Sequence, residues 1–158
     1  VRFVALDVLI DFDDEYAIAV ADSLLFNDSS RMVKSTVLEF LYDQNPTKYY
    51  TKAAQFEEER NDDFYYILTK IYAEQGNGKH HDYFKKALWS ARGIYIPDLI
   101  SNYRLFLQKN DQIEIVENAT QFLADLAIYE ELDFTKYSVI SVLETLKKYF
   151  KQTKKEAQ

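Results

Sequence analysis

The chain has 158 residues, of which 47% are hydrophobic and 28% charged, so its composition is that of a folded domain rather than a disordered one. It contains only 3 Gly and 2 Pro, and with so few turn-forming residues a β-sandwich or barrel with many hairpins is disfavoured. Cys is absent, which excludes disulfides, thiolate metal sites and cysteine nucleophiles and fits a reducing, cytoplasmic location.

The net charge of −7 is unevenly distributed along the chain. Residues 1–63 carry 14 acidic and 6 basic side chains, a balance of −8, whereas residues 64–158 carry 12 acidic and 13 basic ones, a balance of +1. An acidic amino-terminal half repels phosphate backbones and attracts basic partners. We therefore expect another protein with a basic surface as the partner. Nucleic acid is disfavoured, and because no apolar run reaches membrane-spanning length, a membrane is not expected.

Helical start and stop signals recur along the whole chain. They predict helices near residues 1–11, 14–26, 30–43, 46–59, 62–75, 80–92, 97–109, 112–130 and 134–152. Residues suited to capping the free amides of a first turn precede many of them: Asp13, Ser29, Asn45, Asn61 and Asp133. Pro46 and Pro97 fit first turns, and Gly76 and Gly93 are placed where a left-handed C-cap would need glycine.

Every second predicted helix repeats one apolar stripe, with positions spaced i, i+4, i+7 and i+8. The stripes are Val1, Ala5, Val8 and Leu9; Val33, Val37, Phe40 and Leu41; Phe64, Leu68, Ile71 and Tyr72; Leu99, Tyr103, Phe106 and Leu107; and Val139, Leu143 and Leu146. They start 32, 31, 35 and 40 residues apart, which indicates a repeat.

The intervening helices are also two-faced. Apolar residues follow one side of the helices at 14–26 and 112–130: Ala17, Ala21, Leu24 and Leu25, and Ile113, Val116, Ala119, Leu123 and Leu126. A helix pair of this kind cannot cover its own apolar surface, so we expect the pairs to stack. The predicted fold is a single all-α domain, residues 1–158, of about nine helices whose alternate members share one surface suited to a partner.

The segment from Leu24 to Leu41 resembles the HEAT repeat, especially its short bacterial form. That pattern has leucines, then an Asp in the turn between two helices, and then a Val-Arg pair that opens the second helix. Asp28 matches the turn Asp, and Val33-Lys34 matches the pair in part. Val1-Arg2 matches the same pair in a preceding repeat unit. Lys in place of Arg weakens the contact expected with Asp28. The sequence motif can be followed over residues 1–42, and beyond them only the arrangement of helices resembles the family. The resemblance implies a right-handed α-α superhelix and a protein-binding scaffold.

Two acidic clusters and three Tyr residues are the candidate partner-binding residues. They are Asp11, Asp13, Asp14 and Glu15; Glu57 and Glu58, beside Glu59, Asp62 and Asp63; and Tyr50, Tyr65 and Tyr66. The first cluster lacks the Gly of a calcium loop and reads as a polar link between helices. The second is expected to be solvated, where it could meet a basic partner without being buried. Tyr is favoured at interfaces because it buries much area at low entropy cost.

No residue set supports catalysis, a metal or another cofactor. His80 and His81 are adjacent and point about 100° apart on a helix, so they are poor joint metal ligands and with Asp82 fit a helix start. Trp89, within Ala87-Leu88-Trp89, is expected in the core. The lysine run at 147–155 fits a solvated helix end.

The function expected is therefore a non-catalytic protein-binding scaffold domain, which could belong to a longer chain. One alternative is a small acidic bacterial immunity or inhibitor protein that masks a basic toxin. Another is a HEAT-like DNA alkylation-repair glycosylase, which would need a basic groove and is disfavoured by the acidity of the chain.

Overall fold

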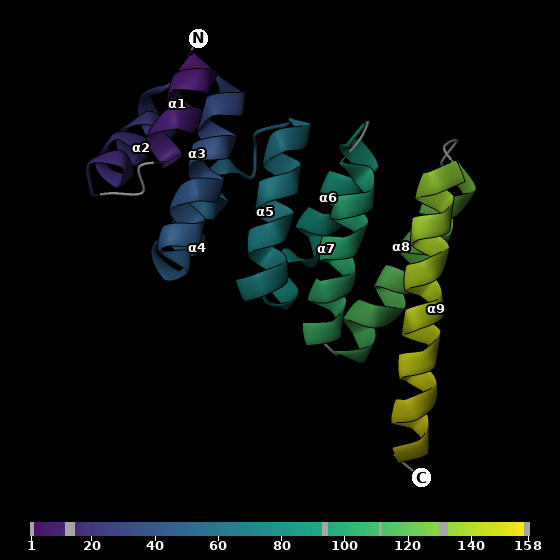
Figure 1. Cartoon of the computed structure of the whole chain (residues 1–158). Helices are drawn as coiled ribbons and strands as arrows, with labels where there is room; N and C mark the ends of the chain where they lie inside the picture. Colours follow the sequence, from purple (N-terminus) through teal and green to yellow (C-terminus); the bar gives the residue numbers. More distant parts are fainter. Residues whose placement is uncertain (1, 12–14, 93–94, 111, 130–132, 157–158) are drawn as a thin grey trace. The chain divides into compact units, whose positions relative to one another are not determined.

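The structure, a computed structural model, describes residues 2–11, 15–92, 95–110, 112–129 and 133–156 (Figure 1). Within these ranges the chain is all-α, and nine α-helices pack against their neighbours. The helices are α1 (Arg2–Asp11), α2 (Glu15–Asn27), α3 (Arg31–Gln44), α4 (Pro46–Ala53), α5 (Asp62–Gln75), α6 (His81–Ser90), α7 (Ile96–Lys109), α8 (Ile113–Tyr129) and α9 (Asp133–Glu156). Two 3₁₀ turns, Ala54–Phe56 and Gly78–His80, follow α4 and precede α6.

Side-chain caps define several of these helix starts. The Oδ1 of Asn45 accepts from Lys48 N at 3.0 Å, and that of Asn61 accepts from Asp63 N at 2.9 Å, as the sequence predicted. The prediction of Ser29 as a cap is wrong by one residue. Ser30 caps α3 by accepting from Val33 N, because the turn before it is closed by Asp28, whose carboxylate accepts from Ser30 N at 2.7 Å. Asp13 lies outside the described residues, and Asp133 is itself the first residue of α9.

Helix α4 ends at Ala53, well short of the end predicted near residue 59. The chain tightens there into the 3₁₀ turn, which directs the ring of Phe56 into the core, where it is only 6% exposed. That ring stacks against Phe26 and Phe64, with centroids 5.9 and 5.4 Å away. Burial of one aromatic ring therefore overrides the helical tendency of the residues that follow it.

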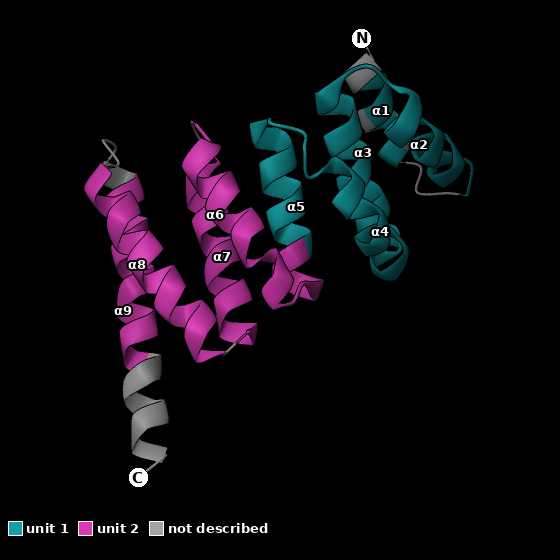
Figure 2. Ribbon diagram, turned by 180° about the vertical axis from the view of Figure 1, so that it is seen from behind, with its two compact units in different colours: residues 1–71 teal, residues 72–158 magenta. Residues whose placement is uncertain are grey.

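The chain divides into two compact units, residues 1–71 and 72–158, with the division inside α5 (Figure 2). In the first unit α3 packs against α1, α2 and α4. In the second unit α6 packs against α7 and α8, and α9 packs against α7 and α8. Alternate helices are thus neighbours within each unit: α1 with α3 in the first, and α6 with α8 and α7 with α9 in the second.

The predicted stripes on α3, α5 and α7 are buried at all four positions. On α9, Val139 and Leu146 are buried and Leu143 is half-buried. The intervening helices follow their predicted faces too, since Ala17, Ala21 and Leu25 are buried on α2 and four of the five predicted positions are buried on α8. Because caps and helical periodicity are local properties, they located these faces correctly.

Two positions of the predicted stripes are wrong on α1 and one is wrong on α8. Ala5 and Val8 are exposed and Leu6 is buried instead, because residues 1–10 are apolar on nearly every side and their period does not select a face. Val1 and the side chain of Leu9 lie outside the described part of the chain. Ile113 is 64% exposed, and Ile115 occupies the buried position in the first turn of α8.

Gly76 does not provide the left-handed C-cap expected of it. Its φ is not in the left-handed region; it is required because a Cβ there would lie 2.4 Å from the carbonyl oxygen of Tyr72. The same carbonyl accepts from Gly76 N at 2.9 Å, so the close approach is part of the helix end. Gly93, the other expected C-cap, lies outside the described residues.

Replacing Gly76 by Ala should destabilise the protein by about 2–3 kcal/mol, because the obstructing atom is backbone and cannot move aside. Gly78 is the matched control. A Cβ at Gly78 would meet only side-chain atoms, the closest being Cδ1 of Ile115 at 2.7 Å, and that side chain can turn, so Gly78→Ala should cost under about 1 kcal/mol. Urea unfolding of both variants measures the difference; equal losses would contradict this role of Gly76.

Candidate functional site

The acidic cluster after α4 surrounds a turn and the start of α5. Glu58 is exposed and Glu57 half-buried, while Glu59 forms an ion pair with Arg31 at 2.9 Å. Asp62 and Asp63 are half-buried in the first turn of α5, where their charge opposes the positive end of the helix dipole. The segment from 57 to 63 contains five acids and one Arg, so its local charge is −4.

The other acidic cluster is described only in part. Asp11 is the last residue of α1 and Glu15 is the exposed first residue of α2, whereas Asp13 and Asp14 lie outside the described residues. The two described acids stand at the end of α1 and the start of α2. Glu15 lies in the first turn of α2, where a negative charge is favourable.

The candidate Tyr residues differ in what they present to solvent. Tyr50 and Tyr66 are half-buried, and each follows a buried Tyr: Tyr49 at 1% and Tyr65 at 2% exposure. In each pair one ring is therefore in the core and its neighbour is partly accessible. Tyr65 has almost no surface to offer a partner, so of this pair Tyr66 is the one placed for docking.

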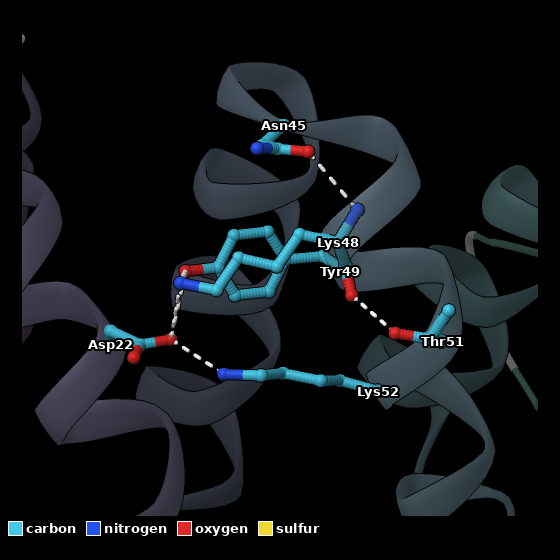
Figure 3. Close-up of polar contacts among 6 residues, drawn as sticks. All are labelled: Asp22, Asn45, Lys48, Tyr49, Thr51 and Lys52. Carbon is cyan, nitrogen blue, oxygen red and sulfur yellow. Dashed lines mark hydrogen bonds and ion pairs between the residues drawn. The ribbon is translucent and has the colours of Figure 1, made fainter.

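A polar network that sequence reasoning missed joins α2 to α4 (Figure 3). The hydroxyl of Tyr49 donates to Oδ1 of Asp22 at 2.7 Å, and Nζ of Lys52 donates to the same oxygen at 2.9 Å. Nζ of Lys48 donates to the Tyr49 hydroxyl at 2.8 Å and lies 3.6 Å from Asp22. Lys48 and Lys52 are one helical turn apart, so the sequence places them on one face of a helix. It does not indicate that their acceptor, Asp22, lies about 30 residues earlier in the chain.

The pKa shifts of this network indicate a structural role. Burial, then the hydrogen bond and charge of Asp22, raise the pKa of Tyr49 to about 12, so its hydroxyl remains a donor at neutral pH. Burial alone would raise the pKa of Asp22, but hydrogen bonds from Lys52 and Tyr49 and the two lysine charges lower it overall. A base would need the opposite shift at the Tyr. The network therefore acts as a clamp between helices.

A second clamp joins α5 to α3 within the first unit. Nζ of Lys70 donates to Glu39 at 2.9 Å and to Asp43 at 3.4 Å. Burial alone would lower the pKa of Lys70, but the hydrogen bond and charge of Glu39, with the contribution of Asp43, raise it. Arg31, Lys52 and Lys70 of this acidic unit thus form ion pairs with carboxylates of the same unit.

Tyr49→Phe should destabilise the protein by about 1 kcal/mol, because it removes a donor from a half-buried carboxylate and an acceptor from Lys48. Tyr16, on the neighbouring α2 and 71% exposed, is the matched control, and Tyr16→Phe should change stability by less than about 0.5 kcal/mol. Urea unfolding at neutral pH measures both. A neutral effect of Tyr49→Phe would contradict the clamp.

In the second unit a buried His–Tyr pair lies between α6 and α7. Nε2 of His81 is 2.7 Å from the hydroxyl of Tyr103, and the two side chains are 7% and 0% exposed. Burial, with the charge of Lys85, lowers the pKa of His81, and burial raises that of Tyr103. His80 instead caps the turn before α6 through its ring nitrogen and Asn77 N, 3.1 Å apart. The expectation that these histidines form a helix start is confirmed.

The stability of the protein should fall as pH decreases below about 6.5, because the unfolded chain protonates His81 more readily than the folded one does. Because folding lowers the pKa of His81, its neutral form contributes fully to the free energy of unfolding above about pH 6.5. Below that pH the contribution is lost with a slope of up to about 1.4 kcal/mol per pH unit, until the pKa of the folded state is reached. Urea unfolding of wild type and His81→Gln between about pH 7.5 and 5 isolates this slope. Parallel curves for the two proteins would refute it.

Trp89 is not in the core, contrary to the prediction from its apolar neighbours. It is 52% exposed, because α6 buries the adjacent face that carries Phe84, Ala87 and Leu88. Its ring lies 6.4 Å from that of Phe122 and 6.2 Å from that of Tyr129, centroid to centroid, both on α8. The second unit therefore carries an aromatic cluster on its surface.

Comparisons with protein families, curated proteins and solved structures found no match to this chain. Among the residues that the structure describes, no group of three or more His, Cys, Asp or Glu side chains is arranged to hold a metal ion. In the same ranges, no helix combines the length and apolar character needed to cross a bilayer. The structure offers two candidate surfaces, the acidic segment 57–63 and the aromatic cluster around Trp89.

Proposed function

We propose that this chain is a non-catalytic helical repeat domain of the HEAT type that binds another protein with a basic surface. The observation that carries the proposal is the packing of alternate helices against one another within each unit. In the first unit α1 lies on α3; in the second α6 lies on α8 and α7 on α9. Stacked helix pairs produce this pattern, and the family adds the expectation of a right-handed superhelix.

The turn between α2 and α3 also supports the repeat. Asp28 is 8% exposed, its amide donates to Leu24 O at 3.0 Å, and its carboxylate accepts from Ser30 N at 2.7 Å. The resemblance assigns an Asp to this position. A buried carboxylate that closes the turn between paired helices is a physical reason for that residue type there.

Charge supports a basic partner for the first unit. Residues 1–71 hold 14 acidic and 7 basic side chains, a balance of −7, and residues 72–158 hold 12 of each. A field of one sign raises the association rate of a partner of opposite sign and discriminates against like-charged ones. The exposed Glu58 and half-buried Glu57 lie in the segment 57–63 of this unit, whose local charge is −4.

Reversing both charges, Glu57→Lys with Glu58→Lys, should lower retention of a captured partner about tenfold, which corresponds to about 1.4 kcal/mol. Affinity capture from a lysate of the source cells, with quantitative mass spectrometry at low and high salt, measures it. Wild type should retain proteins of basic surface in a salt-sensitive manner.

Glu144→Lys is the control for that experiment, because Glu144 is an exposed acid on α9 in the second unit, whose net charge is zero. It should leave retention unchanged. If wild type enriches no protein above empty resin, the proposed function is wrong. If all three proteins retain the same partner equally, the acidic segment is not where it binds.

A narrower role is favoured by the same charge distribution: an immunity or inhibitor protein that covers a basic toxin. The −7 balance of residues 1–71 suits a tight cover over a cationic active site. Co-expression separates the two roles, because an inhibitor protects cells from its toxin whereas a scaffold domain does not.

A further inference from the structure

The exposed aromatic cluster on the second unit is built from α6 and α8. Trp89 is 52% and Tyr129 72% exposed, and Phe122, whose ring also lies beside that of Trp89, is half-buried. The planes of Phe122 and Tyr129 are inclined to that of Trp89 by 53° and 74°, so neither ring is stacked flat against the indole. Large aromatic side chains are normally buried, and a group of them exposed on one surface is typical of an interaction site.

Acidic and polar residues accompany the rings along α8. Phe122 and Tyr129 are seven residues apart, and Asp125 lies between them at helical spacing, with Gln121 and Glu114 one and three turns earlier. Asp125 is half-buried, and its Oδ1 accepts from Gln121 Nε2 at 3.0 Å. Helix α8 contains three acids, Glu114, Glu117 and Asp125, and no Lys, Arg or His.

The cations near Trp89 are held by the protein itself. Lys85, one turn before Trp89, forms an ion pair with Asp82 at 2.7 Å. Nη1 of Arg92 donates to the carbonyl oxygens of Trp89 and Ala91, at 3.1 and 2.8 Å, and so satisfies the end of α6. Lys86 is half-buried. These cations all lie on α6 or just after it, whereas α8 contributes rings and carboxylates and carries no cation.

We propose that Trp89, Phe122, Tyr129 and Asp125 form a docking surface for a basic segment of the partner protein. An Arg or Lys side chain of that segment stacks on the Trp89 or Tyr129 ring with its charge toward Asp125, while neighbouring apolar side chains cover Phe122. Aromatic faces attract guanidinium and ammonium groups, and a nearby carboxylate adds to that attraction. This inference rests on the proposed function and names the chemistry of the partner at one surface.

The acids of α8 select a protein rather than a nucleic acid as the occupant. Stacked aromatic rings also bind unpaired bases, but binding of that kind needs a basic groove that follows the phosphates. Three carboxylates and no cation along α8 repel phosphate instead. A basic peptide satisfies both the rings and the charge.

The test uses the full chain and two capped, dye-labelled helical peptides, one of Arg, Leu and Ala and a twin with Glu in place of every Arg. Fluorescence anisotropy measures affinity for wild type and variants. In unlabelled titrations Trp89, the single Trp of the chain, reports contact by a change in its emission. Wild type should bind the Arg peptide and shift the emission, and should bind the Glu twin at least tenfold more weakly.

Trp89→Ala should weaken binding of the Arg peptide about tenfold, and Asp125→Asn about threefold. The matched control is Tyr137→Ala, which removes an equally exposed aromatic ring, 73% accessible, from α9 of the same unit, and should leave affinity unchanged. Circular dichroism melting of each variant shows that the unit is folded. Asp125→Asn keeps shape and all three rings, so a weaker complex there cannot come from lost packing.

Equal losses for Trp89→Ala and Tyr137→Ala, equal binding of the Glu twin, or tighter binding of a labelled single-stranded oligonucleotide than of the Arg peptide would each overturn the inference. If the Arg peptide does not bind while capture of a cellular partner persists in Trp89→Ala, this docking surface is wrong and the proposed function stands. If wild type captures no cellular protein, the proposed function fails independently of the peptide result.

Discussion

Helix α3 buries side chains on three sides because α1, α2 and α4 all pack against it, and the rest of the first unit is arranged around that requirement. A helix with apolar residues over so wide an arc cannot be covered by one partner. In the second unit aromatic rings cover the apolar faces of neighbouring helices. Phe84, Tyr103 and Phe106 stack between α6 and α7, with centroids 4.6 to 6.4 Å apart, and Phe122 of α8 meets Tyr103 edge-on at 6.3 Å.

Polar groups inside both units serve this packing. Asp22 on α2 accepts hydrogen bonds from Tyr49 and Lys52 on α4, and Lys70 on α5 donates to Glu39 on α3. His81 on α6 is hydrogen-bonded to Tyr103 on α7. A buried polar atom is costly unless it is paired, so these contacts select one alignment of the helices. In these contacts burial raises the pKa of Tyr49 and lowers that of His81, so both shifts favour the neutral side chain.

What remains for a partner is the surface, and its two distinctive regions differ in chemistry. The segment 57–63 of the first unit is a concentration of carboxylates, suited to long-range attraction of a basic protein. The cluster around Trp89 in the second unit offers rings with a carboxylate beside them, suited to short-range contact. Both favour the same kind of partner, which is why one proposal, a repeat domain for a basic protein, accommodates them.

The sequence alone determined where the helices lie and which face is buried on α3, α5 and α7, because caps and the 3.6-residue period depend only on neighbouring residues. It also placed Asp28 in the turn between α2 and α3. Only the tertiary structure decided that Trp89 faces solvent, that Phe56 ends a helix early, and that Asp22 meets Lys52. These outcomes depend on which side chain of another helix arrives at the same place, and no local pattern contains that information.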